Sequence, residues 1–231
     1  MEGDHCDETY ARLGRRWGTG PSEVALVAEE RLATLGRRGP LLRVLDLGCG
    51  YGRDALHLRA RLGGSVVGVD SSAEAIDLAE RRREELARAD ETFAHGVRFV
   101  HALLAALDAG WCDVVGTNGL YHLLDPEGRE AFAACARRHL APGGLLFLAT
   151  LSSEDPQHYG KGVVVAGELD SFVDTVYLHF ARERELRQTF AWLDLRELYE
   201  HEYIEPQTDG TVHHHVSWIL VGVRPPAGRS L

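Results

Sequence analysis

The stretch VLDLGCGYGRD, residues 44–54, decides the fold of this chain. A short apolar run leads into three glycines at alternate positions, Gly48, Gly50 and Gly52, and helical spacing begins at residue 53. Glycine has no Cβ, so the backbone can turn sharply there and approach a ligand closely. The free N–H groups of the following helix point toward the same place. The stretch therefore predicts a buried strand, a ligand-binding turn and a helix.

Strands and helices alternate on the C-terminal side of this stretch. Apolar runs predict buried strands over 43–47, 65–70, 97–101, 112–117 and 145–150, and helical spacing predicts helices over 53–62, 72–89 and 126–140. Such alternation is typical of parallel βαβ units in a doubly wound α/β sheet. Two strand-like runs, 193–205 and 211–223, flank an Asp-Gly turn signal and predict a terminal β-hairpin.

Two segments do not fit the alternation. Residues 8–17 and the run that begins at Pro21 have helical spacing, so we expect residues 1–38 to form a helical cap or lid on a domain of residues 39–231. Residues 151–180 have no clean period. Long irregular connections inside a domain are usually functional, so we expect this one to take part in the site.

Composition narrows the class of protein. The 231 residues suit one domain, and 35 acidic against 25 basic residues give a net charge of −10, which disfavours nucleic acid and anionic membranes as partners. No apolar run reaches the length of a membrane span, and the polar N-terminus is unlike a signal peptide. The four cysteines lack zinc-site spacing and are expected to be reduced thiols. We expect a cytoplasmic protein; a homodimer is compatible with the sequence.

The glycine loop favours one nucleotide ligand over another. Dinucleotide sites use G-x-G-x-x-G, whereas Arg53 here occupies the third glycine position and Asp46 precedes the loop. That acid would repel a pyrophosphate and attract an ammonium group, such as that of S-adenosylmethionine (SAM). Asp70 ends the second predicted strand, where a carboxylate can accept the ribose hydroxyls of either ligand. The loop, and not Asp70, therefore points to SAM.

Four motifs, VLDLGCGYGRD, VVGVD, CDVV and LAPGGLLFL, resemble those of class I SAM-dependent methyltransferases over about residues 40–150. Within that family the chain most resembles the small tellurite-resistance and thiopurine-type branch, through GCGYGRD, residues 151–162 and YLHF at 177–180. The resemblance implies a Rossmann-like fold with a seven-stranded, mostly parallel sheet and an antiparallel last strand. It also implies in-line transfer of a methyl group from SAM to a small-molecule acceptor, with S-adenosylhomocysteine as the product.

The sequence departs from the family at one adenine-binding position. Leu103 stands where the family often has an acid after the third strand, so backbone of the 101–103 segment or another side chain must meet the adenine. The Asn-Pro-Pro-Tyr motif of nucleic-acid amino methyltransferases is also missing from the sequence. This omission and the acidic charge disfavour DNA or RNA as the acceptor.

Ligands of doubly wound sheets bind beyond the carboxyl ends of the strands. We therefore expect the cofactor to be bound by Asp46, Gly48, Cys49, Gly50, Gly52, Asp70, Ser71, Ala102, Leu103 and Asn118. The acceptor pocket is expected from residues 10–22, 119–122 and 151–162. Its candidate substrate-binding residues are Tyr10, Trp17, Tyr121, Lys161 and His215, and its catalytic candidates are His122, His158 and Tyr159.

Each of these candidates has a structural alternative. His122 is either a general base or a packing residue in a turn, and Trp17 either covers the site or packs a helix on the sheet. His213 and His215 share one face of a strand while His214 points away. The pair could line a pocket, be half-exposed strand residues, or form a metal cluster with His122 or His158. Three successive histidines are not a recognised metal-ligand spacing, so we expect no metal.

The function also has alternatives at this stage. The acceptor atom is a thiol or chalcogen, or an oxygen or nitrogen of a biosynthetic intermediate, because the shape of loops sets an acceptor pocket and no motif does. A protein that binds SAM without catalysis is one rival. An NAD(P)-dependent oxidoreductase on the same sheet is a second, disfavoured by Asp46 and Arg53.

Overall fold

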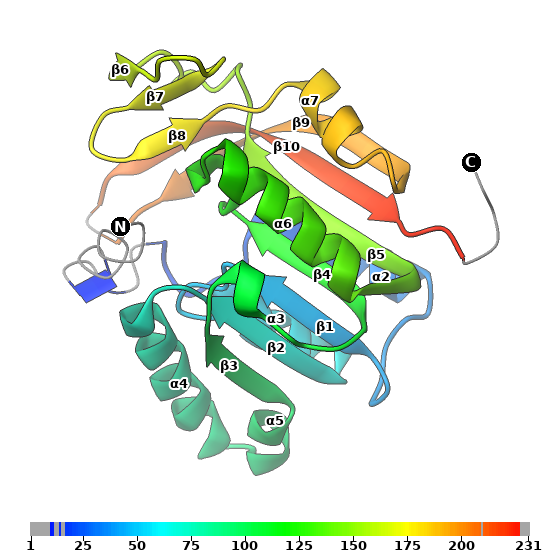
Figure 1. The fold of residues 1–231 in the computed structure, drawn as a ribbon. Helices are drawn as coiled ribbons and strands as arrows, with labels where there is room; N and C mark the ends of the chain where they lie inside the picture. The colour runs from blue at the N-terminus through cyan, green and yellow to red at the C-terminus, as the bar shows by residue number, and fades with distance from the viewer. Residues whose placement is uncertain (1–9, 12–13, 15–16, 209, 227–231) are drawn as a thin grey trace.

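A seven-stranded sheet runs through the computed structural model, which describes residues 10–11, 14, 17–208 and 210–226 (Figure 1). The strands are β1 (Arg43–Leu47), β2 (Ser65–Asp70), β3 (Val97–His101), β4 (Cys112–Asn118), β5 (Leu140–Leu151), β9 (Asp194–Pro206) and β10 (Val212–Val223). Their order in the sheet is β3-β2-β1-β4-β5-β10-β9. The first five pair in parallel, whereas β10 pairs antiparallel with both β5 and β9. The predicted doubly wound sheet and its terminal hairpin are confirmed.

Helices cover both faces of the sheet because its central strands are apolar on both sides. The helices are α2 (Glu23–Thr34), α3 (Arg53–Leu62), α4 (Ala73–Ala87), α5 (Glu91–His95), α6 (Pro126–His139) and α7 (Glu183–Thr189). Val44 and Val114 pack with α2, α3 and α4 in one core cluster. Leu45 and Val115 pack with α6 and α7 in another, and α6 lies in front of β4 and β5 in Figure 1.

Side-chain caps fix where several helices begin. The Ser72 hydroxyl accepts a hydrogen bond from Ala75 N at the start of α4, as the sequence pattern predicts. Asp125 caps α6, whose first position is Pro126. The predicted helix over 8–17 falls mostly outside the described residues, and in the described part of the chain no helix is long and apolar enough to cross a bilayer.

The segment from 151 to 180 differs from its expected irregular form. It contains a small antiparallel sheet of β6 (Val163–Val164), β7 (Ser171–Val173) and β8 (Tyr177–His179). Strands of two or three residues are too short to leave a period in the sequence. Polar side chains attach this sheet to the domain: His179 Nε2 lies 2.9 Å from the Glu185 carboxylate of α7, and Arg129 of α6 donates to the Tyr177 hydroxyl at 2.8 Å.

Candidate functional site

The glycine loop between β1 and α3 is a tight backbone cradle. Gly48 and Gly50 have φ values of 71° and 52°, in the region that L side chains rarely adopt. A Cβ on Gly48 would lie 2.9 Å from the Leu120 Cβ, and one on Gly50 would lie 2.7 Å from the Tyr10 hydroxyl. The glycines therefore let Leu120 and Tyr10 approach the loop backbone more closely than a residue with a side chain would allow.

The Asp70 carboxylate holds the glycine loop in place. Its Oδ2 accepts from Gly50 N at 2.8 Å and its Oδ1 accepts from Ser72 N at 2.9 Å. A carboxylate has about four acceptor positions, so further hydrogen bonds can form. Asp70 thus couples the end of β2 to the loop.

Asp46 is a buried acid at the base of the same loop. Only 4% of its surface is exposed, and among the described residues its Oδ2 has no hydrogen-bond partner. Burial, together with the nearby carboxylates of Asp54 and Asp70, raises the pKa of Asp46 well above its ordinary value. Three acids gathered around one loop favour a cationic ligand.

The other predicted cofactor residues follow the ends of neighbouring strands. Ala102 N donates to Asp70 O at 3.0 Å, the exposed Leu103 comes next, and the half-buried Asn118 ends β4. The Ser71 carbonyl lies 3.0 Å from His101 Nε2. These positions share the carboxyl edge of the parallel strands, as predicted.

Cys49 and Gly52 complete the predicted set of cofactor residues. Burial raises the pKa of the Cys49 thiol well above its ordinary value, which makes it an unreactive small residue of the loop. Gly52 caps α3 with a left-handed backbone. Both therefore shape the loop and add no chemistry of their own.

An aromatic group lies beside the glycine loop. Trp17 stacks on Tyr51 with ring centroids 6.4 Å apart, and Tyr10 meets both rings edge-on. The Tyr51 hydroxyl donates to Gly18 O at 2.8 Å, and Arg53 Nη1 donates to Trp17 O at 3.0 Å. Tyr51 and Arg53 were not predicted as site residues, although they are part of the motif itself.

Asp54, the last residue of the motif, anchors the start of α2. Its carboxylate accepts from Ser22 N at 2.7 Å and from the Ser22 hydroxyl at 2.6 Å, while that hydroxyl caps α2. Asp54 was not predicted as a site residue. The motif therefore binds the N-terminal segment as well as forming the loop.

Three histidines, His158, His213 and His215, gather where β10 begins. Their ring centroids lie 5.3–5.6 Å apart in pairs: 5.4 Å for 158–213, 5.3 Å for 158–215 and 5.6 Å for 213–215. We call this set the histidine cluster. His213 and His215 share a face, as predicted, and His158 comes from the connection after β5. Burial and the neighbouring imidazoles lower the pKa of His158, although the Asp155 carboxylate opposes this.

The Asp155 carboxylate contacts both segments that carry the histidine cluster. It is buried, and its Oδ2 lies 3.1 Å from His215 Nδ1 and accepts from Val216 N at 3.1 Å. Its Oδ1 accepts from His158 N at 2.8 Å. Burial opposes ionisation, but these hydrogen bonds outweigh it and hold the pKa of Asp155 below its ordinary value. Nothing in the sequence distinguishes Asp155 from the many other acids of the chain, and it was not predicted.

Two predicted residues make contacts that the sequence did not indicate. Tyr121 is buried, and its hydroxyl donates to Glu185 at 2.8 Å. The Tyr159 hydroxyl donates to Asp170 at 2.7 Å and its ring packs on Phe172 and Phe180, which places its hydroxyl on the small-sheet segment and not in the histidine cluster.

His122 and Lys161 complete the predicted acceptor residues. Burial lowers the pKa of His122 to about 3, and its Nδ1 accepts from Leu151 N at 3.3 Å. Such a weakly basic ring favours the packing interpretation, since a general base works best with a pKa near the working pH. Lys161 is exposed, and its positive charge contributes to lowering the pKa of His158.

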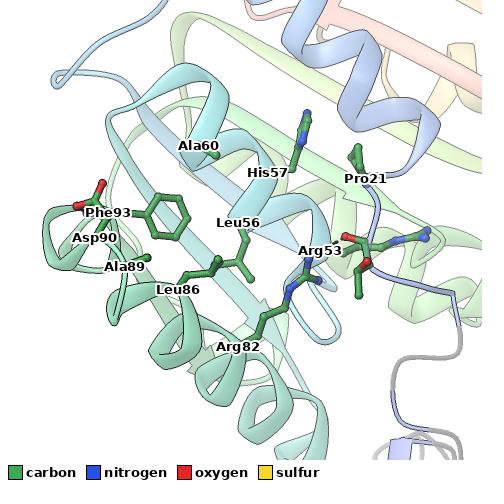
Figure 2. Close-up of a pocket in the computed structure, with 11 residues that line it drawn as sticks. Pro21, Arg53, Leu56, His57, Ala60, Arg82, Leu86, Ala89, Asp90 and Phe93 are labelled. Carbon is green, nitrogen blue, oxygen red and sulfur yellow. Dashed lines mark hydrogen bonds between the residues drawn. The ribbon is translucent and has the colours of Figure 1, made fainter.

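Two cavities lie outside the glycine loop itself. One is a groove of about 370 Å³ that Arg53, Leu56 and His57 of α3, Leu86 of α4 and Phe93 of α5 help to line. Figure 2 shows these side chains. A second hollow of about 860 Å³ lies among α6, α7 and β8. None of the predicted cofactor residues lines either cavity, so neither is the candidate cofactor site.

Comparisons with known proteins agree with this geometry. The profile of a family described as "Methyltransferase domain" matches residues 44–144. A ubiquinone biosynthesis O-methyltransferase of Xanthomonas oryzae pv. oryzae is 30% identical over 196 residues, which cover 83% of this chain and 79% of that protein. One of Methylocella silvestris is 35% identical over 111 residues, 48% of this chain and 40% of that protein. The chain thus spans less than half the length of several such relatives.

Solved structures share the fold at lower identity. A protein studied for the conversion of a disulfide bond into a thioacetal group during echinomycin biosynthesis aligns with a TM-score of 0.72 at 22% identity, covering 99% of this chain and 93% of that one. Magnesium protoporphyrin IX methyltransferase from Synechocystis PCC 6803 with bound SAM aligns with a TM-score of 0.66 at 18% identity, covering 97% of both chains. TehB from Haemophilus influenzae gives 0.65 at 17%, covering 97% and 67%. Motif, fold and relatives together show that this chain belongs to the class I SAM-dependent methyltransferase family.

Proposed function

We propose that the chain transfers the methyl group of SAM to a small-molecule acceptor at the strand-end edge that carries the glycine loop and the histidine cluster. One observation carries the proposal most directly: the buried Asp46 carboxylate, two residues before Gly48, has an oxygen without a partner among the described residues. A cationic ligand would satisfy that oxygen. The anionic pyrophosphate of a dinucleotide would not.

The proposed cofactor contacts follow the strand ends in order. Asp46, Gly48, Cys49, Gly50 and Gly52 would hold the methionyl end; Asp70 and Ser71 the ribose; Ala102 and Leu103 the adenine; and Asn118 the side toward the sulfonium. Bound SAM supplies an activated methyl group. The chain then has to orient the acceptor and exclude water. The proposed cap residues Tyr10 and Trp17, fixed beside the loop by Tyr51 and Arg53, suit the second task.

For the acceptor we propose a small molecule that presents a hydroxyl group. The curated relatives named above are O-methyltransferases by name. A hydroxyl is a weaker nucleophile than a thiolate and gains from a nearby group that takes its proton or lowers its pKa. The histidine cluster supplies imidazoles at this edge of the sheet, and the exposed Lys161 lies near enough to His158 to affect its pKa.

Calorimetry tests the cofactor half of this proposal. SAM and S-adenosylhomocysteine should bind the untagged protein and NAD should not. Asp46→Asn keeps the shape of the side chain but removes the carboxylate with which a cation would pair, so it should weaken SAM binding by about 10- to 100-fold, the effect of losing a hydrogen bond to a charged group. Asp77→Asn, on the exposed face of α4, is the matched control and should leave the affinity unchanged.

Three outcomes contradict the proposal at different points. Binding of NAD without binding of SAM would favour an oxidoreductase. An unchanged SAM affinity in Asp46→Asn would remove the role of that carboxylate. SAM binding with no transfer of a labelled methyl group to any of a panel of phenols, alcohols, thiols and amines would favour a SAM-binding protein without catalysis.

A further inference from the structure

We infer that His158, His213 and His215 form a binding site for a divalent transition-metal ion of the zinc class. One nitrogen of each ring can be chosen so that all three lie within 4.8 Å of one another. Imidazole nitrogen is a ligand that zinc and its neighbours prefer. The ligands come from two segments about 55 residues apart, so they form no compact ligand motif in the sequence. For lack of such a motif we expected no metal.

The spacing of the nitrogens is close to what a metal needs. With zinc–nitrogen bonds of about 2.1 Å, tetrahedral ligands lie ~3.4 Å apart, so nitrogens within 4.8 Å of one another have to close by at most about 1.4 Å. Rotation of the side chains would supply this change. His213 is half-exposed near the start of β10, whereas His215 is buried and contacts Asp155.

A buried carboxylate orients one of the ligands. Asp155 Oδ2 lies 3.1 Å from His215 Nδ1, which leaves His215 Nε2 as the nitrogen available to an ion. Metal-bound histidines almost always hold their second nitrogen in this way, which fixes the tautomer and the ring orientation. Backbone N–H groups of His158 and Val216 hold the same carboxylate, so ligands from both segments are joined through Asp155.

The strand pattern separates the cluster from an ordinary run of histidines. His214 lies on the opposite face of β10, where its Nε2 lies 2.6 Å from Glu202 Oε1. His214 is therefore an exposed surface histidine that does not face the histidine cluster. The cluster is therefore set by the face of the strand and not by the local abundance of histidine.

The proposed site keeps one position open. Three protein ligands and a free fourth position are typical of catalytic zinc sites, whereas structural sites use four protein ligands. Glu205 Oε2 lies 3.9 Å from His215 Nε2, and Glu205 Oε1 pairs with Arg53 Nη2 at 3.2 Å, beside the glycine loop. An ion there would bind the hydroxyl of the acceptor and lower its pKa. That role rests on the proposed function; the metal site itself does not.

The test uses untagged protein stripped with a chelator and titrated with Zn²⁺ against a chromophoric competitor. We expect one tight equivalent per chain. His213→Ala and His214→Ala make the same chemical change at adjacent positions on opposite faces. The first should weaken binding at least tenfold, and the second should leave it unchanged. Asp155→Asn should weaken it by about 10- to 100-fold, the range for partners that orient a ligand.

A second probe identifies the ligands without using enzymatic activity. Co²⁺ in place of Zn²⁺ should give the visible absorption bands of a four-coordinate nitrogen site in the wild type and in His214→Ala, and weak bands in His158→Gln. Circular dichroism melting establishes that each variant is folded. The proposal is overturned if the wild type binds no Zn²⁺, if His214→Ala loses as much affinity as His213→Ala, or if folded His213→Ala binds as the wild type does. SAM calorimetry on the same samples tests the proposed function separately.

Discussion

The glycine loop and the histidine cluster lie at the same edge of one sheet, yet they are built differently. The loop is made of backbone: contiguous residues 48–52 with left-handed glycines, held by the Asp70 carboxylate. The cluster is made of side chains from two distant segments, held by the buried Asp155. A site made of backbone is sensitive to added atoms. A site made of side chains is sensitive to lost ones.

The largest expected effect comes from adding one methyl group to the loop. Gly48→Ala places a Cβ 2.9 Å from the Leu120 Cβ on a left-handed backbone, so we expect a loss of about 3 kcal/mol of unfolding free energy from strain and overpacking. Gly116→Ala in β4 is the matched control, because its Cβ meets no atom within 4 Å. Urea unfolding measures both. Equal, small losses would show that the loop is not a tight cradle.

Removing Asp155, which holds the histidine cluster, should lower the unfolding free energy by less than Gly48→Ala does and should leave the glycine loop unchanged. Asp155→Ala leaves His215 Nδ1 and the Val216 N–H without their partner, so we expect a loss of about 2 kcal/mol of unfolding free energy. SAM affinity should stay within twofold of the wild type, because the cofactor cradle is built elsewhere. A large fall in SAM affinity in a folded Asp155→Ala protein would show that the two regions are not independent.

Asp46→Asn should stabilise the protein in the absence of ligand. Because burial and nearby acids raise the pKa of Asp46 in the folded state, the folded protein retains a proton that the unfolded chain releases. The stability contribution of this carboxyl is therefore lost as pH rises above about 4, its unfolded value. We expect the variant to gain about 1 kcal/mol at pH 7.5 and almost nothing at pH 4. Urea unfolding at both pH values checks this, and a loss at pH 7.5 would contradict it.

The smallest effect concerns the attachment of the N-terminal segment to the loop. Tyr51→Phe removes the hydrogen bond to Gly18 O and keeps the ring stacked on Trp17. We therefore expect a loss of about 1 kcal/mol or less of unfolding free energy. Limited proteolysis should cleave near residues 17–21 faster in this variant than in Tyr199→Phe, a control on β9 whose ring is partly exposed. Equal cleavage rates would mean that this bond does not fasten the segment.

Most of the sheet could be predicted because its signals are local. The strand over 97–101 and the N-cap at Ser72 need only neighbouring residues to be recognised. The partners of Tyr121 and Tyr159, in contrast, are the carboxylates Glu185 and Asp170 of other segments, which no spacing rule connects to them. Asp155 and Asp54 could not be predicted for the same reason, because their partners also lie in distant segments; Asp54, for example, binds Ser22.

The position of β10 between β5 and β9 has a consequence for the order in which the protein folds on the ribosome. Chains emerge from their N-terminus, and β1 to β5 can pair as they appear. β9 is made before β10 but pairs with the sheet only through it, so its 13 residues stay unpaired until β10 has emerged. The cofactor half can thus form on a nascent chain before the histidine cluster, which needs β10.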